Sequence, residues 1–253
     1  METRTLQHNT HWVMIGLAVA LFSGCKWMPG RPRESDRWRP PEAEKNFAVL
    51  YDTNCLACHS NGKTVSASIS MTDPLYLAVV PRETLRKVIA QGVPGTAMPG
   101  FAAANGVGLT DAQIDILVQG IYKWAEGKPV AKENLPPYSG PLGDAGRGAT
   151  AYNTYCEKCH GAEGKGGKAG PVVDSDYLHL ASDQYLRTVV IAGRPELGMP
   201  NFQQNEPGKP MSPQDISDVV AWLVSHRQNP GAAQLATTTD PAPKAQPLKS
   251  NQE

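Results

Sequence analysis

The feature that most constrains the fold of this chain is an internal repeat. The pattern Cys-x-x-Cys-His occurs twice in its 253 residues, beginning at Cys55 and again at Cys156, so the two copies are 101 residues apart. Other residues recur at the same offset: Tyr51 and Tyr152, Leu85-Arg86 and Leu186-Arg187, Gly92 and Gly193, Met98-Pro99 and Met199-Pro200, and Phe101 and Phe202. A repeat that extends this far beyond one motif predicts two copies of the same folded unit.

The repeat and the composition of the segments around it indicate how the chain is divided. We expect homologous domains at 43–128 and 144–229, each near the usual size of a compact domain, about 100 residues. The 25–42 segment is rich in Pro and Arg and is predicted to be a semi-rigid tether. The proline-rich 129–143 segment is predicted to be a linker. The last segment, 230–253, contains few large apolar residues and is predicted to be disordered.

Helical periodicity dominates within both domains. From the spacing of apolar residues, helices are expected at 42–51, 82–91 and 110–125 in the first domain, and at 145–155, 183–192 and from Ser212 onward in the second. Gly92 and Gly193 are expected to end two of these helices, while Thr110 and Ser212 are expected to cap the beginning of two others. Alternating patterns typical of strands are scarce, so the predicted fold class is all-α.

The charge balance argues against one class of partner. The chain has 24 Lys and Arg residues and 24 Asp and Glu residues, so its formal net charge is zero. A nucleic-acid-binding protein usually shows a basic excess or a basic stripe. The sequence has neither, and we expect no nucleic acid among the partners.

An apolar segment near the N-terminus predicts export. Residues 12–24 are uncharged and mostly apolar, a run shorter than the roughly 20 residues of a membrane-spanning helix but suited to a secretory signal. The segment ends Phe22-Ser23-Gly24-Cys25, which resembles the lipobox of bacterial lipoproteins. The resemblance implies a signal peptide at 1–24 and a lipid anchor at Cys25, on the periplasmic side of a bacterial membrane. An uncleaved anchor and a cleaved soluble form are the alternatives.

The residue after each Cys-x-x-Cys pair decides between three kinds of site. A bare pair is compatible with a redox dithiol, half of a zinc site or a haem attachment, whereas a following histidine is the signature of c-type haem. A four-cysteine zinc site would leave both histidines without a role, and a thioredoxin-like dithiol expects a βαβ context that is missing here. We therefore predict two covalent haem c groups, each with a histidine as axial iron ligand: Cys55, Cys58 and His59 for the first, and Cys156, Cys159 and His160 for the second.

The repeated methionines are candidates for the second axial ligand. Met98 and Met199 each lie 39 residues after the histidine of their own domain, in a loop that contains Gly and Pro. Prolines restrict the backbone of such a loop, which helps to hold a weakly binding thioether in place. The alternative is that these methionines only fill gaps in the core. Met71 and Met211 do not repeat and are predicted to be packing residues.

On these motifs both halves resemble class I cytochrome c domains, and the tandem resembles dihaem cytochromes c. The resemblance implies two small helical bundles, each around one covalently bound haem c. In that family a Gly-Pro carbonyl commonly accepts a hydrogen bond from the ligating histidine. Gly170-Pro171 matches this feature, but the first domain has Ile69 at that position, so the contact is not implied there. The second domain also matches the family more closely at two other positions, with Gly161 against Ser60 after the motif and Trp222 against Gly120 in the last helix.

The two ligand sets predict electron transfer rather than an enzymatic reaction. Ligation by His and Met fills all six coordination positions of an iron and leaves none for a substrate. We expect a respiratory-chain cytochrome, either a free carrier or a subunit of an oxidoreductase complex, whose partners are a quinol-oxidising complex, a dehydrogenase or a terminal oxidase. The alternatives are a dihaem peroxidase-like enzyme and a haem gas sensor, each of which needs one open iron site.

Overall fold

The computed structural model describes residues 30, 33–65, 67–105, 108–130 and 134–227. The predicted signal peptide, Cys25 and the predicted tail at 230–253 lie outside the described residues. The chain divides into two compact units, Met1–Ala43 and Glu44–Glu253. Across the described residues the secondary structure is helical, with two isolated β-bridges and no strand. The predicted all-α fold class is confirmed.

The described part of the first unit contains two short 3-10 helices, η2 (Glu34–Asp36) and η3 (Pro41–Ala43). The backbone N–H of Arg33 donates to Asp36 Oδ2 over 2.8 Å, which caps the start of η2. Trp38, between the two helices, is exposed to solvent. Among the described residues of the chain, no helix combines the length and the apolar character needed to cross a membrane.

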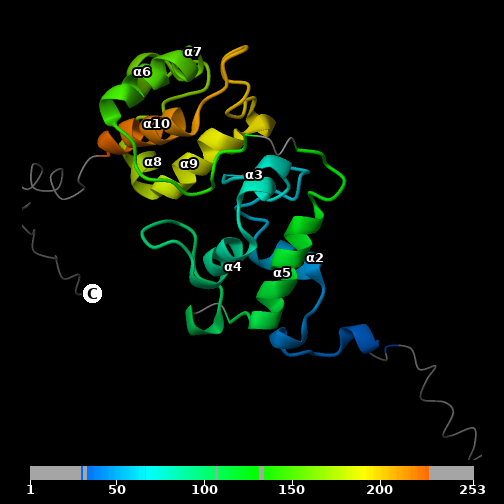
Figure 1. The fold of residues 1–253 in the computed structure, drawn as a ribbon. Coiled ribbons are helices and arrows are strands. Elements are labelled where there is room, and N and C mark those ends of the chain that lie inside the picture. The colour runs from blue at the N-terminus through cyan, green and yellow to red at the C-terminus, as the bar shows by residue number, and fades with distance from the viewer. Residues whose placement is uncertain (1–29, 31–32, 66, 106–107, 131–133, 228–253) are drawn as a thin grey trace, which may run out of the picture. The chain divides into compact units, whose positions relative to one another are not determined.

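The second unit contains two lobes built from corresponding helices (Figure 1). The first lobe, residues 44–128, contains α2 (Phe47–Asn54), α3 (Pro74–Val79), α4 (Arg82–Gln91), η4 (Ala103–Asn105) and α5 (Asp111–Lys123). The second lobe, residues 144–227, contains α6 (Ala145–Tyr155), α7 (Glu157–His160), η5 (Ala162–Gly164), α8 (Ser175–Leu180), α9 (Asp183–Ala192), η6 (Pro195–Leu197) and α10 (Pro213–Ser225). Helices α2, α3, α4 and α5 correspond to α6, α8, α9 and α10.

Local capping explains where the predicted helices begin. Helices α4, α6 and α9 have the predicted bounds. The prediction for 42–51 was wrong at its start, because the Asn46 side chain accepts hydrogen bonds from the N–H groups of Ala48 and Val49 and so begins α2 at Phe47. In α5 the predicted cap is confirmed, since Thr110 and Gln113 bond reciprocally as a capping box.

Three α-helices, α3, α7 and α8, were missing from the sequence expectations. Helices α3 and α8 each have six residues and follow an aspartate at the repeat offset. The Asp73 side chain accepts from the Tyr76 N–H over 2.7 Å, and the Asp174 side chain accepts from the Tyr177 N–H over 2.9 Å. A segment this short contains too few apolar positions to show a helical period, so the cap is the signal that could have revealed it.

Each lobe has its own apolar core between its helices. The first core contains Leu50, Tyr51, Leu85, Ile89, Ile114, Leu117 and Ile121, and the second contains Tyr152, Leu186, Val190, Ile216, Val219 and Leu223. Met71 is buried in the first core and Met211 in the second, which confirms the prediction that both are packing residues.

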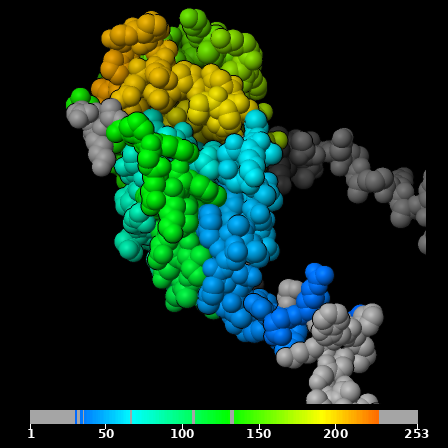
Figure 2. All heavy atoms as spheres, turned by 90° about the vertical axis from the view of Figure 1, so that its right-hand side faces the viewer, coloured from blue at the N-terminus to red at the C-terminus, as the bar shows by residue number. Residues whose placement is uncertain are grey.

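The two lobes interlock through α3 and α9, which contact each other. Leu75 of α3 is buried in the core of the second lobe, and Ala192 at the end of α9 is buried in the core of the first. In Figure 2 the cyan atoms of the first lobe and the yellow atoms of the second lie directly against each other. The contact is not symmetric, because α3 and α9 are not corresponding helices.

The described part of the linker is fastened to the second lobe by one buried arginine. The Arg187 guanidinium donates to the carbonyl oxygens of Pro137 and Tyr138 and to Ser217 Oγ, over 3.0 to 3.1 Å. Burial lowers the pKa of Arg187. These neutral oxygens solvate the charge in place of water, so the segment before α6 is held against α9 and α10.

Candidate functional site

Both Cys-x-x-Cys-His motifs form a single helical turn after the first helix of their lobe. In the first lobe the N–H of His59 donates to the Cys55 carbonyl over 2.9 Å, and the N–H of Cys58 donates to the same oxygen over 3.2 Å. The second motif repeats this, with His160 donating to the Cys156 carbonyl over 3.0 Å. Residues three and four apart on a helical turn share one face. The two cysteines and the histidine of each motif are therefore presented together.

The four thiols of these motifs are unpaired; Cys58 is exposed, and the other three cysteines are half-buried. Burial raises the pKa of Cys55 and of Cys156 to about 12, so both are neutral thiols at physiological pH. Among the described residues, no three His, Cys, Asp or Glu side chains gather to form a metal site. Neither reactive thiolate chemistry nor a four-cysteine zinc site is favoured by this arrangement.

The orientation of both imidazoles suits an iron ligand. His59 Nδ1 lies 2.9 Å from the Ile69 carbonyl oxygen, and His160 Nδ1 lies 3.1 Å from the Gly170 carbonyl oxygen. A carbonyl can only accept, so Nδ1 holds the proton and Nε2 keeps its lone pair for a metal. The contact that the resemblance implied for the second lobe is present in both lobes. Ile69 provides it as well as Gly170 does, because the acceptor belongs to the backbone.

The environment of His59 also favours its neutral form. Burial lowers the pKa of the imidazole, the hydrogen bond with Ile69 acts in the opposite direction, and the positive charge of Arg194 lowers it further. A neutral imidazole is the form that binds a metal ion. Arg194 belongs to the second lobe, so the first motif is influenced by a charge from across the contact between the lobes.

A repeated tyrosine anchors the residue after each histidine. The Tyr51 hydroxyl donates to the Ser60 carbonyl over 2.8 Å, and the Tyr152 hydroxyl donates to the Gly161 carbonyl over 2.7 Å. Burial raises the pKa of both phenols, to about 12 for Tyr152, so they stay protonated donors. Sequence reasoning noticed these tyrosines as part of the repeat but gave them no role. Their identical offset from the motif was the available signal.

The methionine loops are closed against the ends of α4 and α9. Gly92 ends α4 with φ +71°, where a Cβ atom would lie 2.6 Å from the Met98 carbonyl oxygen. Gly193 ends α9 with φ +73°, and the same atom would lie 2.7 Å from the Met199 carbonyl oxygen. Only glycine accepts this backbone angle and this proximity without strain. The prediction that these glycines end the helices is confirmed.

Hydrogen bonds fix the two loops to different degrees. The Val93 N–H donates to the Met98 carbonyl over 3.0 Å. In the second lobe Arg194 and Met199 exchange two backbone hydrogen bonds of 3.0 Å. Met98 is half-buried and packs on the same core as Cys55, and Met199 is half-buried as well. The backbone of both loops is thus held next to the helix end that precedes the methionine.

Comparison with known proteins agrees with this geometry. The model of one family, described as cytochrome c oxidase, cbb3-type, subunit III, matches residues 42–119 and 143–223. The chain belongs to this family. Each matched segment contains one Cys-x-x-Cys-His motif and one Met-Pro loop, so the predicted tandem of cytochrome c domains is confirmed. Domains of this family imply covalently bound haem c, and the free thiols and the Nε2 lone pairs fit that group.

Curated relatives include the cytochrome bc1 complex cytochrome c subunits of Mycobacterium bovis and Mycobacterium tuberculosis, each 26% identical over 179 residues. The match covers 69% of this chain and 60% of the relatives' length, so the chain spans less than two thirds of those proteins. Among solved structures, a chain of the reducing HAO-like protein complex of Kuenenia stuttgartiensis matches with a TM-score of 0.43 and 17% identity. That match covers 76% of this chain and all of the other.

Proposed function

We propose that this chain is a dihaem c-type cytochrome that transfers electrons in a respiratory chain, with His and Met as axial ligands of both irons. The observation that supports this most directly is the repeated geometry of the two histidines. In each lobe a backbone carbonyl holds Nδ1 and leaves Nε2 available, next to two unpaired cysteines on the same helical turn. A bound haem c supplies a one-electron couple at each of these sites.

The chain's own residues have distinct parts in this function. We assign Cys55 and Cys58, and Cys156 and Cys159, to the thioether bonds. His59 and His160 are proposed to bind iron from one side and Met98 and Met199 from the other. Six-coordinate iron changes its oxidation state with little rearrangement, and the loop hydrogen bonds at Met98 and Met199 restrain the ligand on that side.

The organisation proposed for the whole chain follows the sequence expectations. Two haem domains at 43–128 and 144–229 are joined by the linker at 129–143. A lipoprotein signal at 1–24, a lipid anchor at Cys25 and a tether at 25–42 would keep them at the periplasmic side of a membrane. The C-terminal segment, 230–253, would form a disordered tail.

The proposed partners are other redox proteins. The mycobacterial relatives are named as subunits of a cytochrome bc1 complex. By analogy, we propose a quinol-oxidising complex as electron donor and a terminal oxidase or a second cytochrome as acceptor, with a dehydrogenase as the alternative donor. Under this proposal the chain acts as a carrier or a complex subunit and has no substrate site of its own.

Carbon monoxide binding to the reduced, matured protein tests the ligand assignment. Carbon monoxide needs an open axial position, so we expect no spectral change at neutral pH in the wild type. Met98→Ala and Met199→Ala should each open one iron and bind one carbon monoxide per chain. Binding to the wild type would instead favour a peroxidase-like enzyme or a gas sensor. Absence of two covalent haems per chain would refute the proposal itself.

A further inference from the structure

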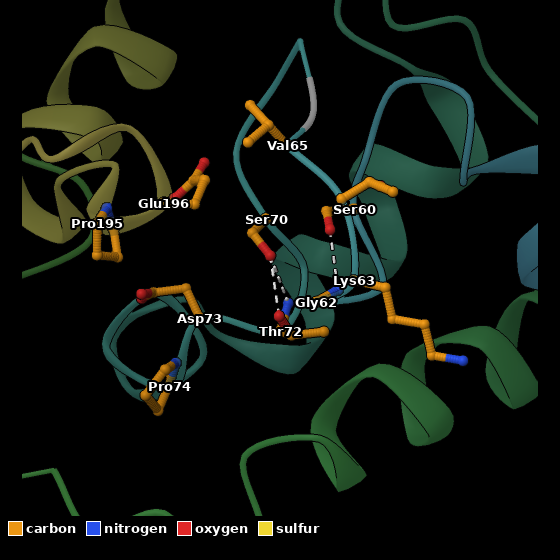
Figure 3. A pocket seen from close by; sticks show the side chains of 11 residues that line it. Ser60, Gly62, Lys63, Val65, Ser70, Thr72, Asp73, Pro74, Pro195 and Glu196 are labelled. Carbon is orange, nitrogen blue, oxygen red and sulfur yellow. Dashed lines mark hydrogen bonds between the residues drawn. The ribbon is translucent and has the colours of Figure 1, made fainter.

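The contact between the lobes contains a pocket beside the first motif. It has a volume of about 360 Å³, and its walls come from the segment that follows His59 and from the methionine loop of the second lobe. Figure 3 shows Ser60 and Ser70 on one side and Pro195 and Glu196 on the other. Ser60 directly follows His59, and Ser70 directly follows Ile69, the residue that holds the imidazole. The second lobe therefore faces, across this pocket, residues adjacent to His59 and Ile69.

Arg194, at the start of that methionine loop, is a buried charge at this contact. Its side chain is only 9% exposed, and its Nε donates to Glu196 Oε1 over 2.5 Å. The carboxylate is more exposed, at 23%. The residue at the corresponding position of the first lobe is Val93. The charged pair is thus a property of the second methionine loop alone.

The residues on either side of Arg194 face the first lobe. Pro195 and Glu196 line the same pocket as Ser60 and Ser70 of the first lobe. Ala192, two residues before Arg194, is buried in the first core, which explains how the arginine comes near the first motif. Since the arginine is buried, solvent screens its field less than it would at the surface.

We propose that Arg194 raises the reduction potential of the haem in the first lobe and that Glu196 moderates this effect. The proposal rests on the proposed function. An oxidised haem has one more positive charge than the reduced form, so a nearby buried cation destabilises the oxidised form more. The step is the transfer of one electron from a redox partner to the first iron, which passes from Fe(III) to Fe(II). No bond breaks, and Arg194 keeps its proton throughout.

The decisive experiment is a redox titration of the matured full chain with both haems bound. Arg194→Gln should lower the potential of the first haem by about 59 mV, which corresponds to a tenfold change in its one-electron equilibrium. Glu196→Gln should raise the same potential, because it removes the negative charge that is paired with the arginine. Met199→His, expected to lower the potential of the second haem, assigns the two transitions.

Two further variants serve as controls. Arg194→Lys preserves the charge and should leave the first potential within about threefold of the wild-type equilibrium, or about 28 mV. Arg86→Gln removes an arginine paired with Asp111 and Asp115 at the surface of the first lobe and should change both potentials little. If Arg194→Gln does not fold, the lysine and Glu196 variants decide the question.

Three results would overturn the inference. They are shifts of the same sign in the Arg194→Gln and Glu196→Gln variants, a larger change at the second haem than at the first, and no change at either haem. Each of these leaves the proposed function intact as long as two covalent haems are present. A chain without covalent haem would refute the proposed function instead, so the two failures are distinguishable.

Discussion

In both lobes the first helix packs against the last helix, but the large residue and the small residue at the contact have changed places. In the first lobe the Phe47 ring of α2 lies over Gly120 of α5, where a Cβ atom would come within 2.1 Å of the ring. In the second lobe the large residue is Trp222 of α10 and the small one is Gly148 of α6, at the corresponding positions. This exchange keeps one large and one small residue where the first and last helices of each lobe cross. The repeat therefore preserves the volume at this contact rather than the residue at each position.

The aromatic contacts to the anchoring tyrosines differ as a result. Tyr152 stacks on Trp222 with ring centroids 4.1 Å apart. Tyr51 instead forms a T-shaped contact with Trp124, the residue directly after α5, with ring centroids 4.7 Å apart. Both arrangements bury the tyrosine ring and leave its hydroxyl on the carbonyl after the histidine. The site is maintained while the packing behind it has diverged.

The largest effect is expected from filling the small side of the second crossing. A Cβ atom at Gly148 would lie 2.0 Å from the Asp218 carbonyl oxygen, which belongs to the backbone and cannot rotate away. Gly148→Ala should destabilise the second lobe by about 3 kcal/mol, measured by denaturant unfolding. Gly146→Ala in the same helix, where a Cβ atom would meet only Asp144 Oδ1 at 3.3 Å, is the control and should not destabilise. Equal losses in both variants would contradict this account of the crossing.

The second difference between the lobes is an ion pair. Arg147 of α6 binds Asp218 of α10 through two bonds of 2.8 Å, and the Asp144 N–H donates to the same carboxylate over 2.7 Å. The corresponding residues of the first lobe are Asn46 and Ile116, which cannot form such a pair. Asp218→Asn should destabilise the second lobe by about 2 kcal/mol, since hydrogen bonds to a charged acceptor are lost.

This pair also predicts a difference in acid stability. The hydrogen bond from Arg147 holds the pKa of Asp218 below its ordinary value. The stabilisation is therefore present at neutral pH and is lost as the pH falls through that lowered value. The protection of α10 amides against hydrogen exchange, relative to their intrinsic rates, should fall in acid more than that of α5 amides, and Asp218→Asn should remove the excess. An equal loss of protection in both helices of the wild type would disprove this origin.

The smallest effect should be the same in both lobes. Tyr51→Phe and Tyr152→Phe each remove one hydroxyl bond to a backbone carbonyl and should cost about 1 kcal/mol of unfolding free energy. Thermal unfolding of the two variants measures this. A loss several times larger in one lobe would show that the anchoring bonds are not equivalent, despite their repeated geometry.

The comparison also shows what could be predicted from the sequence. The bounds of α4 and α9 followed from apolar periodicity and a terminal glycine, both of which are local signals. The start of α2 was predicted at residue 42, whereas the cap at Asn46 begins the helix at Phe47, a choice that periodicity does not decide. The short helices α3 and α8 were missed because six residues do not define a period.

Some features of the candidate sites could likewise be predicted from the sequence, and others could not. The motif cysteines, histidines and methionines could be proposed as site residues because their chemistry depends on side-chain type and spacing. The Ile69 carbonyl was not expected, because a backbone acceptor leaves no trace in the residue identity. The influence of Arg194 on the first motif was also not expected, because it depends on contact between residues far apart in the chain.

The exchange of Leu75 and Ala192 between the cores has a consequence for the evolution of this chain. After a duplication, two copies of a unit are at first interchangeable and can be separated again by recombination. Once each copy completes the interior of the other, cutting the linker would leave two fragments, one exposing Leu75 and the other missing it. Separation would then expose to water the apolar surface that each lobe buries in the other. Each half would keep its full core only while it stays joined to the other.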